Sequence, residues 1–297
     1  MNIIKRKNIW FAAFIIVIVV GVGLLFIFKP VWGIDFTGGG LIEIKLKEQL
    51  PIQEVREKAK QTFSQNEVII QSSGENQYIL RAKIDSDNFK EFEAAISKTF
   101  PDANILRHDN IGATLGKALT QRAIYGVVLA CVLIIIYLAY AFRGIPGSIP
   151  PWIFGVIAII TLIHDLIFTV ALYSALGAVF GFEFEGITIV AILTILGFSV
   201  HDTIVVFDRI RENLIKNPQL SIEENANNSI NQTLSRSLNT SLTLIVVLLS
   251  MFLLGGTTIR PFVLMLTIGI AIGTYSSICV ASPLLVKYIE HTQKSSK

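Results

Sequence analysis

Residues 187–213, ITIVAILTILGFSVHDTIVVFDRIREN, begin as an apolar run long enough to cross a lipid bilayer. His201 and Asp202 interrupt that run before it ends. A membrane span needs roughly 20 apolar residues, and a charge near its middle costs several kcal/mol unless it has a partner. The stretch therefore predicts a transmembrane helix whose carboxylate must be explained by its surroundings.

The composition of the whole chain is that of an integral membrane protein. Of its 297 residues, 52% are hydrophobic and 16% are charged, and the mean hydropathy is +0.62, which is too apolar for an ordinary soluble protein. The net charge of +3, without any block of six like charges, gives no reason to expect nucleic acid as a partner. Cys131 and Cys279 lie in apolar runs, where a small hydrophobic residue is commoner than a disulfide or a metal ligand.

Six apolar runs are long enough to span the membrane. The first follows Lys5, Arg6 and Lys7 and has no small-x-small cleavage site after it, so we expect an uncleaved helix with a cytoplasmic N-terminus. Successive crossings then place both termini and the connection 208–235 in the cytoplasm, and residues 31–117 outside. The predicted spans are 9–29 and, in a five-helix bundle over 118–288, about 122–142, 152–179, 187–207, 236–255 and 262–287.

The predicted outer segment, 31–117, has the pattern of a small soluble domain. Its order of elements is βαββαβ, which predicts an α+β ferredoxin-like domain inserted after the first span. The glycine-rich residues 33–40 precede a strand and lack the GxxxxGKS/T pattern, so we favour a backbone turn over a phosphate-binding loop. The predicted strands are 41–46, 67–71, 78–84 and 103–108, the helices 51–63 and 85–100, and a hairpin turn is expected at 73–76.

The cytoplasmic connection has its own helical signals. Residues 208–216 continue the fourth span as a charged helix, and Pro218 marks its end. Ser221 and Glu224 have the spacing of a capping box, so a second helix is predicted to begin at Ile222 and to run along the membrane surface towards the fifth span.

Polar residues recur along one face of three of the predicted spans. Lipid cannot be what these faces contact, so we expect them to face one another or an enclosed path for water. The residues concerned are Thr161, Asp165 and Thr169 in the third span, Ser199 and Asp202 in the fourth, and Arg236, Asn239, Thr240 and Thr243 in the fifth.

Asp202 and Arg236 enter their spans from the same side and can approach each other. Asp202 is about 7 to 8 Å from the inner end of its helix at 1.5 Å per residue. One interpretation is a static ion pair or hydrogen bond between helices. The other is a titrating carboxylate whose proton affinity changes as Arg236 moves, which is what a proton-driven machine requires.

Two His-Asp dipeptides, His164-Asp165 and His201-Asp202, invite comparison with a metal-dependent hydrolase. Adjacent residues on a helix point about 100° apart, so neither pair can readily chelate a metal by itself. His201 remains open to two interpretations, as a proton-relay neighbour of Asp202 or as a hydrogen-bonded packing residue.

The sixth span carries small residues every four positions, at Gly269, Gly273, Ser277 and Ala281. Such a groove lets another helix approach closely, either within the bundle or from a partner subunit. Pro283 follows the groove and is expected to bend the helix.

Taken together and in this order, these motifs resemble the SecD/SecF family of the resistance-nodulation-division superfamily, most closely its SecF branch. The residues that carry the resemblance are GIDFTGG at 33–39, His164-Asp165, 197–213, GTYSS at 273–277 and ASP at 281–283.

The resemblance implies a protein-export subunit in the bacterial cytoplasmic (inner) membrane, with SecD, the SecYEG channel and unfolded preproteins as partners. It further implies that the proton-motive force drives a late, ATP-independent stage of export, and that Asp202 and Arg236 correspond to the family's proton-pathway residues. The family commonly has Asn where this chain has His201. We therefore expect no enzyme and no cofactor, with protons as the coupling ion.

Two other functions fit parts of the pattern. One is a proton-coupled small-molecule or lipid transporter subunit of the same superfamily, although such transporters usually carry both halves and larger outer domains in one chain. The other is a passive scaffold for the translocon, which would keep the Gly269 groove and make Asp202 dispensable.

Overall fold

The computed structural model describes residues 2–63, 68–74, 76–84, 86–143 and 149–295. The chain forms two compact units. The helical unit comprises Met1–Lys29, Gly126–Leu176 and Val190–Lys297, and the sheet unit comprises Pro30–Tyr125 together with Gly177–Ile189.

Within the described residues, six helical segments are long and apolar enough to cross a membrane, in agreement with the six predicted spans. Each agrees with a predicted apolar run, but most extend beyond it because charged and polar residues at the ends continue the helix. The segments are α1 (Lys7–Ile27) with the short η1 (Ile4–Arg6) before it, α5 (Ala113–Ala141), α6 (Trp152–Phe180), α7 (Gly186–Lys216), α8 (Ile222–Leu254), and α9 (Arg260–Ser276) continued by η4 (Ser277–Ala281) and α10 (Ser282–Ser295).

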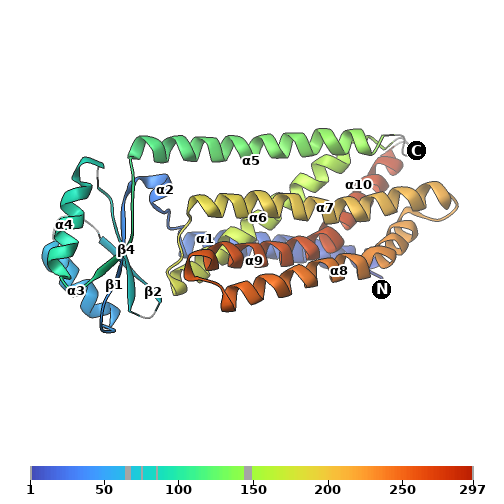
Figure 1. Ribbon diagram of the computed structural model, residues 1–297. Coiled ribbons are helices and arrows are strands. Elements are labelled where there is room, and N and C mark those ends of the chain that lie inside the picture. Colours follow the sequence, from blue (N-terminus) through green and yellow to red (C-terminus); the bar gives the residue numbers. More distant parts are fainter. Residues whose placement is uncertain (1, 64–67, 75, 85, 144–148, 296–297) are drawn as a thin grey trace. The chain divides into compact units, whose positions relative to one another are not determined.

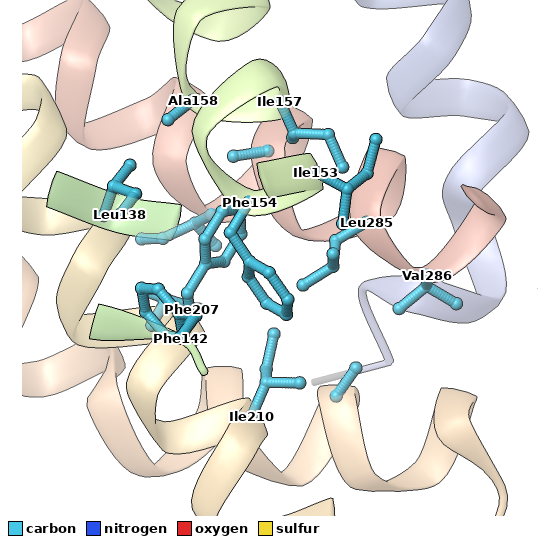
Figure 2. Packing of buried hydrophobic residues seen from close by; sticks show 14 of the residues in the cluster. Leu138, Phe142, Ile153, Phe154, Ile157, Ala158, Phe207, Ile210, Leu285 and Val286 are labelled. Atoms are coloured by element: carbon cyan, nitrogen blue, oxygen red, sulfur yellow. The ribbon is translucent and has the colours of Figure 1, made fainter. Parts of the chain in front are cut away.

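Aromatic side chains form part of the core of the helical unit, as Figure 2 shows. Phe142, just after α5, stacks on Phe154 of α6 with ring centroids 4.7 Å apart and planes 6° apart. Phe207 of α7 approaches both rings edge-on, at 6.3 and 5.5 Å. Such pairs stabilise by about 0.5–1.5 kcal/mol beyond their buried area, so this contact holds three helices together.

The helix that begins at Ile222 is not a separate surface helix, contrary to the prediction. The capping box forms as predicted, with Glu224 N donating to Ser221 Oγ at 3.2 Å and Ser221 N donating to Glu224 Oε2 at 3.1 Å. From there α8 continues without a break to Leu254, because the sequence between contains neither Gly nor Pro. The predicted connection 208–235 is therefore the ends of two long helices joined by a short turn.

The sixth span contains a π-helical turn, η4, between α9 and α10. Ser282 Oγ donates to the carbonyl oxygen of Ser277 at 3.0 Å, five residues earlier. Pro283 follows directly and has no N–H to donate to the carbonyl of Cys279 inside the turn. The sequence predicted a bend at Pro283, and the structure shows a wider turn just before the proline.

The sheet unit is built on four antiparallel strands in the order β2-β3-β1-β4. Helices α3 and α4 lie on one side of the sheet, as Figure 1 shows, over the buried side chains of Ile42, Ile44 and Leu80. Parts of three predicted elements, residues 67, 75 and 85, lie outside the described residues. The elements are β1 (Gly39–Lys45), α3 (Ile52–Thr62), β2 (Val68–Gly74), β3 (Gln77–Ala82), η2 (Ser86–Asn88), α4 (Phe89–Thr99) and β4 (Asn104–Ile111), with the short α2 (Ile34–Thr37) before them.

The glycine-rich segment makes the backbone turn that the sequence predicted. Gly38 and Gly39 have φ angles of +73° and +137°, which side chains of L-residues rarely adopt. A Cβ atom on Gly38 would also lie 2.7 Å from Ala113 Cα, and one on Gly39 would lie 2.6 Å from the carbonyl oxygen of Ala82. These glycines are required because β1 begins in close contact with its neighbours.

Residues 177–189, between α6 and α7, belong to the sheet unit, although the predicted range 31–117 did not include them. Phe184 N donates to the carbonyl oxygen of Val31, and Gly33 N donates to that of Phe184, both at 2.8 Å. Arg81 of β3 adds two ion pairs, Nη1 to Glu183 Oε1 at 2.5 Å and Nη2 to Glu185 Oε1 at 2.7 Å. The connection between two membrane helices is thus bonded to the sheet through backbone and side chains.

Burial dominates the electrostatics of this contact. It raises the pKa of Glu183 and the pKa of Glu185 above the ordinary value for a glutamate, and the nearby Arg81 offsets only part of that effect. Arg81 is itself buried, at 7% exposed. Each charge in this cluster therefore depends on the others for its compensation.

Candidate functional site

Asp165 of α6 is the best-bonded buried carboxylate of the helical unit. Its Oδ2 accepts hydrogen bonds from Ser199 Oγ of α7 and Ser276 Oγ of α9, each at 2.7 Å. Its Oδ1 lies 3.0 Å from Nδ1 of the adjacent His164, which donates when the proton is on that nitrogen. All four side chains are at most 2% exposed. We call these residues, Asp165, His164, Ser199 and Ser276, the Asp165 cluster.

The geometry of the cluster differs from what two His-Asp dipeptides suggested. His164 and Asp165 do contact each other directly. The imidazole ring of His164 also stacks on Phe14 of α1, with centroids 5.0 Å apart and planes 16° apart. The Nε2 atom of His164 is buried without a hydrogen-bond partner among the described residues. His164 therefore orients Asp165 from one side while the two serines bind it from the other.

Asp202 lies on α7, one turn beyond Ser199, and its side chain is only incompletely bonded. Asp202 is 4% exposed, and its Oδ2 is buried without a hydrogen-bond partner in the described part of the chain. Ser237 Oγ of α8 is buried beside it and acts on the carboxylate, but the two groups lie outside hydrogen-bond geometry. A buried carboxylate oxygen in this position is costly while it is charged, so the site favours uptake of a proton or a change in its surroundings.

Arg236 and Thr240 lie at the surface of α8, with Arg236 near enough to Asp202 for its charge to act on the carboxylate. Both are exposed, and Arg236 makes no ion pair with Asp202 or with any other described carboxylate. His201 is exposed on α7, so it does not pack inside this chain. The three residues lie on the outer surface of α7 and α8.

The buried polar face of α8 is instead one residue further along the helix. It consists of small polar residues spaced four apart, each 7% exposed or less. Thr274 of α9 donates from its hydroxyl to Ser241 Oγ at 2.6 Å, which joins this face to the sixth span. The period of four in small residues was a readable signal in the sequence. The face comprises Asn225, Ser229, Thr233, Ser237 and Ser241.

The groove of the sixth span receives α7 of the same chain. A Cβ atom on Gly269 would overlap the side chain of Ile195, and one on Gly273 would lie 3.0 Å from Ser199 Cβ. Ser277 Oγ and Thr203 Oγ1 are hydrogen-bonded at 2.9 Å in the same contact. Of the two predicted uses of the groove, packing within the bundle is therefore the one observed.

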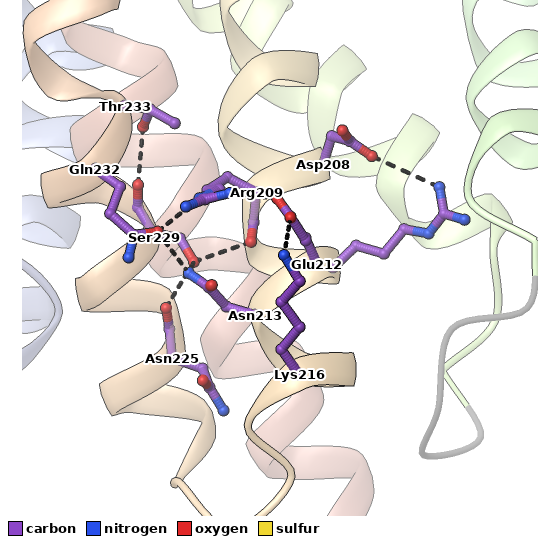
Figure 3. Close-up of polar contacts among 10 residues, drawn as sticks. Asp208, Arg209, Glu212, Asn213, Lys216, Asn225, Ser229, Gln232 and Thr233 are labelled. Carbon is purple, nitrogen blue, oxygen red and sulfur yellow. Dashed lines mark hydrogen bonds and ion pairs between the residues drawn. The ribbon is translucent and has the colours of Figure 1, made fainter.

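Polar contacts join α7 and α8 near their connection, as Figure 3 shows. Asn213 Nδ2 donates to Ser229 Oγ at 2.7 Å and to Gln232 Oε1 at 2.9 Å, and Arg209 Nε also donates to Gln232 Oε1, at 2.6 Å. Glu212 forms ion pairs with Arg209 and with Lys216. These contacts make the α7–α8 end of the helical unit a charged, well-connected region.

An open cavity of about 430 Å³ lies at this end. Its lining includes Ile204 and Val205, within one turn of Asp202 on α7, and charged side chains from both α7 and α8. Arg211 pairs with Asp208 at 3.5 Å and Arg209 pairs with Glu212, so among the described residues Arg236 is the lining cation without a carboxylate partner. The cavity can hold water near Asp202, and its charged lining residues are Asp208, Arg209, Arg211, Glu212 and Arg236.

Comparisons with known proteins agree with this arrangement. A family model described as protein export membrane protein SecD/SecF, C-terminal, matches residues 91–291. The protein translocase subunit SecF of Thermobaculum terrenum is 36% identical, over 97% of this chain and 94% of that protein. The SecF of Anaerolinea thermophila is 37% identical, over 96% of this chain and 93% of that protein. The chain belongs to the SecD/SecF family.

The SecD/SecF family includes a solved structure similar to this one. The crystal structure of SecDF from Thermus thermophilus, described as a translocon-associated membrane protein, superposes with a TM-score of 0.84 at 33% identity. The match covers 97% of this chain but 38% of SecDF, so this chain corresponds to about two fifths of that longer polypeptide. SecD/SecF proteins therefore occur both as separate chains of this length and as one fused chain.

Proposed function

We propose that this chain, a protein translocase subunit by family, conducts protons through its helical unit and uses them to drive a late, ATP-independent stage of protein export. The observation that carries the proposal is Asp202, whose Oδ2 is buried without a hydrogen-bond partner among the described residues. On α7 it lies between Ser199, which binds Asp165, and the open cavity at the α7–α8 end. Protons are the coupling ion, and no enzymatic step or cofactor takes part.

The energetics favour a mechanical use of the protons. A charged Asp202 lacks the donors that Asp165 has, so protonation relieves an uncompensated charge inside the membrane. Each proton that crosses supplies about 2.3 kcal/mol per 100 mV of membrane potential. That amount can shift the equilibrium between two arrangements of helices but cannot drive covalent chemistry.

Arg236 acts in this proposal as a mobile counter-charge. It lines the water-accessible cavity and has no carboxylate partner there, so its guanidinium group is available to approach Asp202 in another arrangement. An approach would favour the charged form of Asp202 and release its proton, and withdrawal would favour uptake. His201 and Thr240, exposed beside it, belong to the same surface.

That surface of α7 and α8 is where we place the SecD half. A charged and polar surface within membrane spans is costly against lipid, so it requires a protein partner. The SecDF of Thermus thermophilus, of which this chain covers 38%, supports a partner of related fold. The SecYEG channel and an unfolded preprotein complete the proposed assembly.

The proposed orientation follows from the sequence and from the order of elements. Cations near the first helix, at Lys5 and Arg6, favour cytoplasmic termini in the bacterial inner membrane and place residues 31–117 outside. The observed order β1-α3-β2-β3-α4-β4 supports a ferredoxin-like arrangement of that domain, attached to the bundle 118–288. Helix movements in the bundle would then pull on an emerging polypeptide.

Export in membrane vesicles, with and without a proton gradient, tests the proposal. In vesicles that contain the full translocase, Asp202→Asn and Arg236→Met should lose the gradient-dependent part of export and keep the part driven by ATP alone. Glu224→Gln, at an exposed carboxylate of α8 outside the cavity, is the control and should keep both parts, because the amide oxygen can still accept the capping hydrogen bond. Unchanged gradient-dependent export in a folded Asp202→Asn complex would refute proton coupling at this site. Crosslinking to a secreted precursor separates protein export from small-molecule or lipid transport.

A further inference from the structure

We propose that a groove between α6 and α10 binds one acyl chain of an anionic phospholipid, with the headgroup held by Lys287 and His291. The groove has a volume of about 340 Å³ and lies wholly within the helical unit. It is separate from the Asp165 cluster and from the cavity that Arg236 lines, and the proposal does not depend on proton coupling.

The floor of the groove is hydrocarbon-like. Four residues of α6, Ile153, Val156, Ile157 and Ile160, line it with the i, i+3, i+4, i+7 spacing of a single helix face, and Leu284 of α10 lies opposite. The α6 residues extend over about 10 Å at 1.5 Å per residue. Ile160 is 42% exposed, so the groove is open to the surface at its deeper end. An extended apolar chain matches this shape.

The other end of the groove is cationic. Lys287, Tyr288 and His291 line it from the middle of α10, and Trp152 at the start of α6 is exposed beside Ile153. Aromatic residues of this kind mark the level of the lipid headgroups. The apolar end of the groove therefore suits an acyl chain, and the cationic end suits the headgroup of the same phospholipid.

The positive charge of Lys287 contacts an aromatic ring and is not neutralised by a described carboxylate. Its Nζ lies 4.5 Å from the centroid of the Phe11 ring and pairs with no described carboxylate. The nearby Glu290 is already bound by Lys7, at 2.7 Å, and Lys7 also binds Glu223. An uncompensated cation at the headgroup level favours an anionic phosphate over a zwitterionic lipid, because basic sites between membrane helices attract such headgroups.

Native mass spectrometry of the full chain in detergent can test the site. The probes are dioleoyl phosphatidylglycerol and dioleoyl phosphatidylcholine, which share acyl chains and differ in headgroup charge. We expect wild type to bind phosphatidylglycerol more tightly and Lys287→Gln/His291→Gln to lose about fivefold or more of that preference. Arg143→Gln, an exposed cation outside the groove, should keep it.

The acyl-chain part of the site has its own pair of variants. Ile160→Trp fills the groove and should weaken binding of both lipids, whereas Ile163→Trp, 51% exposed on α6 but not lining the groove, should leave binding unchanged. Equal affinity for the two lipids in wild type, or unchanged binding in Ile160→Trp, overturns the proposal. A dimer that only Ile160→Trp abolishes would assign the groove to a second copy and overturn it too.

A wild-type measurement makes the test independent of how the variants fold. Phosphatidylglycerol with a photoreactive group in its acyl chain should label peptides from 152–163 of α6 and 282–292 of α10. Label that is spread evenly over the lipid-exposed helices, such as α5, would refute a defined site.

Discussion

Ser199 Oγ donates a hydrogen bond to Asp165 Oδ2 across 2.7 Å and thereby joins α7 to α6 inside the helical unit. Ser276 of α9 donates a second bond to the same oxygen, also at 2.7 Å. Bonds to a charged acceptor are roughly twice as strong as bonds between neutral groups. A single buried carboxylate therefore joins three helices, α6, α7 and α9. The incompletely bonded Asp202 lies one turn beyond Ser199 on α7.

Removing the Ser199 hydroxyl should destabilise the helical unit. Ser199→Ala leaves a buried oxygen of Asp165 with one donor fewer, and we expect a loss of about 1.5–3 kcal/mol in the free energy of unfolding. Denaturation of the full chain in detergent micelles measures it. Thr194→Ala is the control, because the exposed Thr194 hydroxyl bonds only to the carbonyl of Val190 in its own helix. Equal losses in the two variants would contradict the role given to Asp165.

Contact between α7 and the sixth span should not tolerate an added methyl group at Gly269. In Gly269→Ala the new Cβ overlaps the side chain of Ile195, and overpacking of this kind costs about 1–3 kcal/mol. The melting temperature of the full chain should fall and should partly recover in Gly269→Ala/Ile195→Ala. Gly197→Ala provides the comparison, because nothing lies within 4 Å of its added Cβ. An unchanged melting temperature in Gly269→Ala would show that the two helices can separate at this contact.

The ion pairs of Arg81 should be important for the sheet unit. Arg81→Met leaves Glu183, 4% exposed, as a buried charge that has lost its cation, and we expect a loss of about 3–5 kcal/mol. Hydrogen exchange of the Val31 and Phe184 backbone region reports it locally. Replacing both partners, in Arg81→Met/Glu183→Met, should cost much less. Lys47→Met breaks an ion pair that is about three-quarters exposed on each side and should change stability by about 1 kcal/mol at most.

Stability should depend on pH through Glu183 and Glu185. Burial raises the pKa of both carboxyl groups in the folded chain, so the folded state holds these protons more tightly than the unfolded state does. Between the ordinary and the raised pKa values, stability should therefore fall as pH rises. The difference in melting temperature between wild type and Glu183→Gln/Glu185→Gln, measured against pH, should show that slope. A slope of opposite sign would refute the assignment.

Hydropathy and helix signals were sufficient to predict the six helices, because long apolar runs and the capping box at Ser221 have few alternative structures. They were not sufficient to orient α8. Two polar faces lie one residue apart on that helix, Arg236/Thr240 and Ser237/Ser241, and composition alone does not say which one is buried. The prediction named the face of Arg236 and Thr240, whereas the face buried within this chain is that of the small serines, which close packing favours.

Long-range pairing limited the prediction of the site and of the sheet unit in the same way. Asp165 and Ser199 were both predicted as polar residues of neighbouring faces, but no spacing rule indicated that Ser276 would bind the same oxygen. Arg81 and Glu183 are separated by about a hundred positions, so no local pattern indicates that the connection after α6 joins the sheet.

The π-helical turn at Ser277–Ala281 sets the rotation of everything that follows it. Its wider hydrogen-bonded ring holds one residue more than an α-helical turn, and one residue corresponds to about 100° around a helix. Deleting a single residue there would restore a regular helix and turn α10 about its own axis. Leu285 and Ile289 would then leave the core, and Lys287 would leave the groove beside α6. The number of residues in this turn therefore determines which face of α10 packs into the core. A related sequence with a one-residue gap at this point would have a different packing of α10.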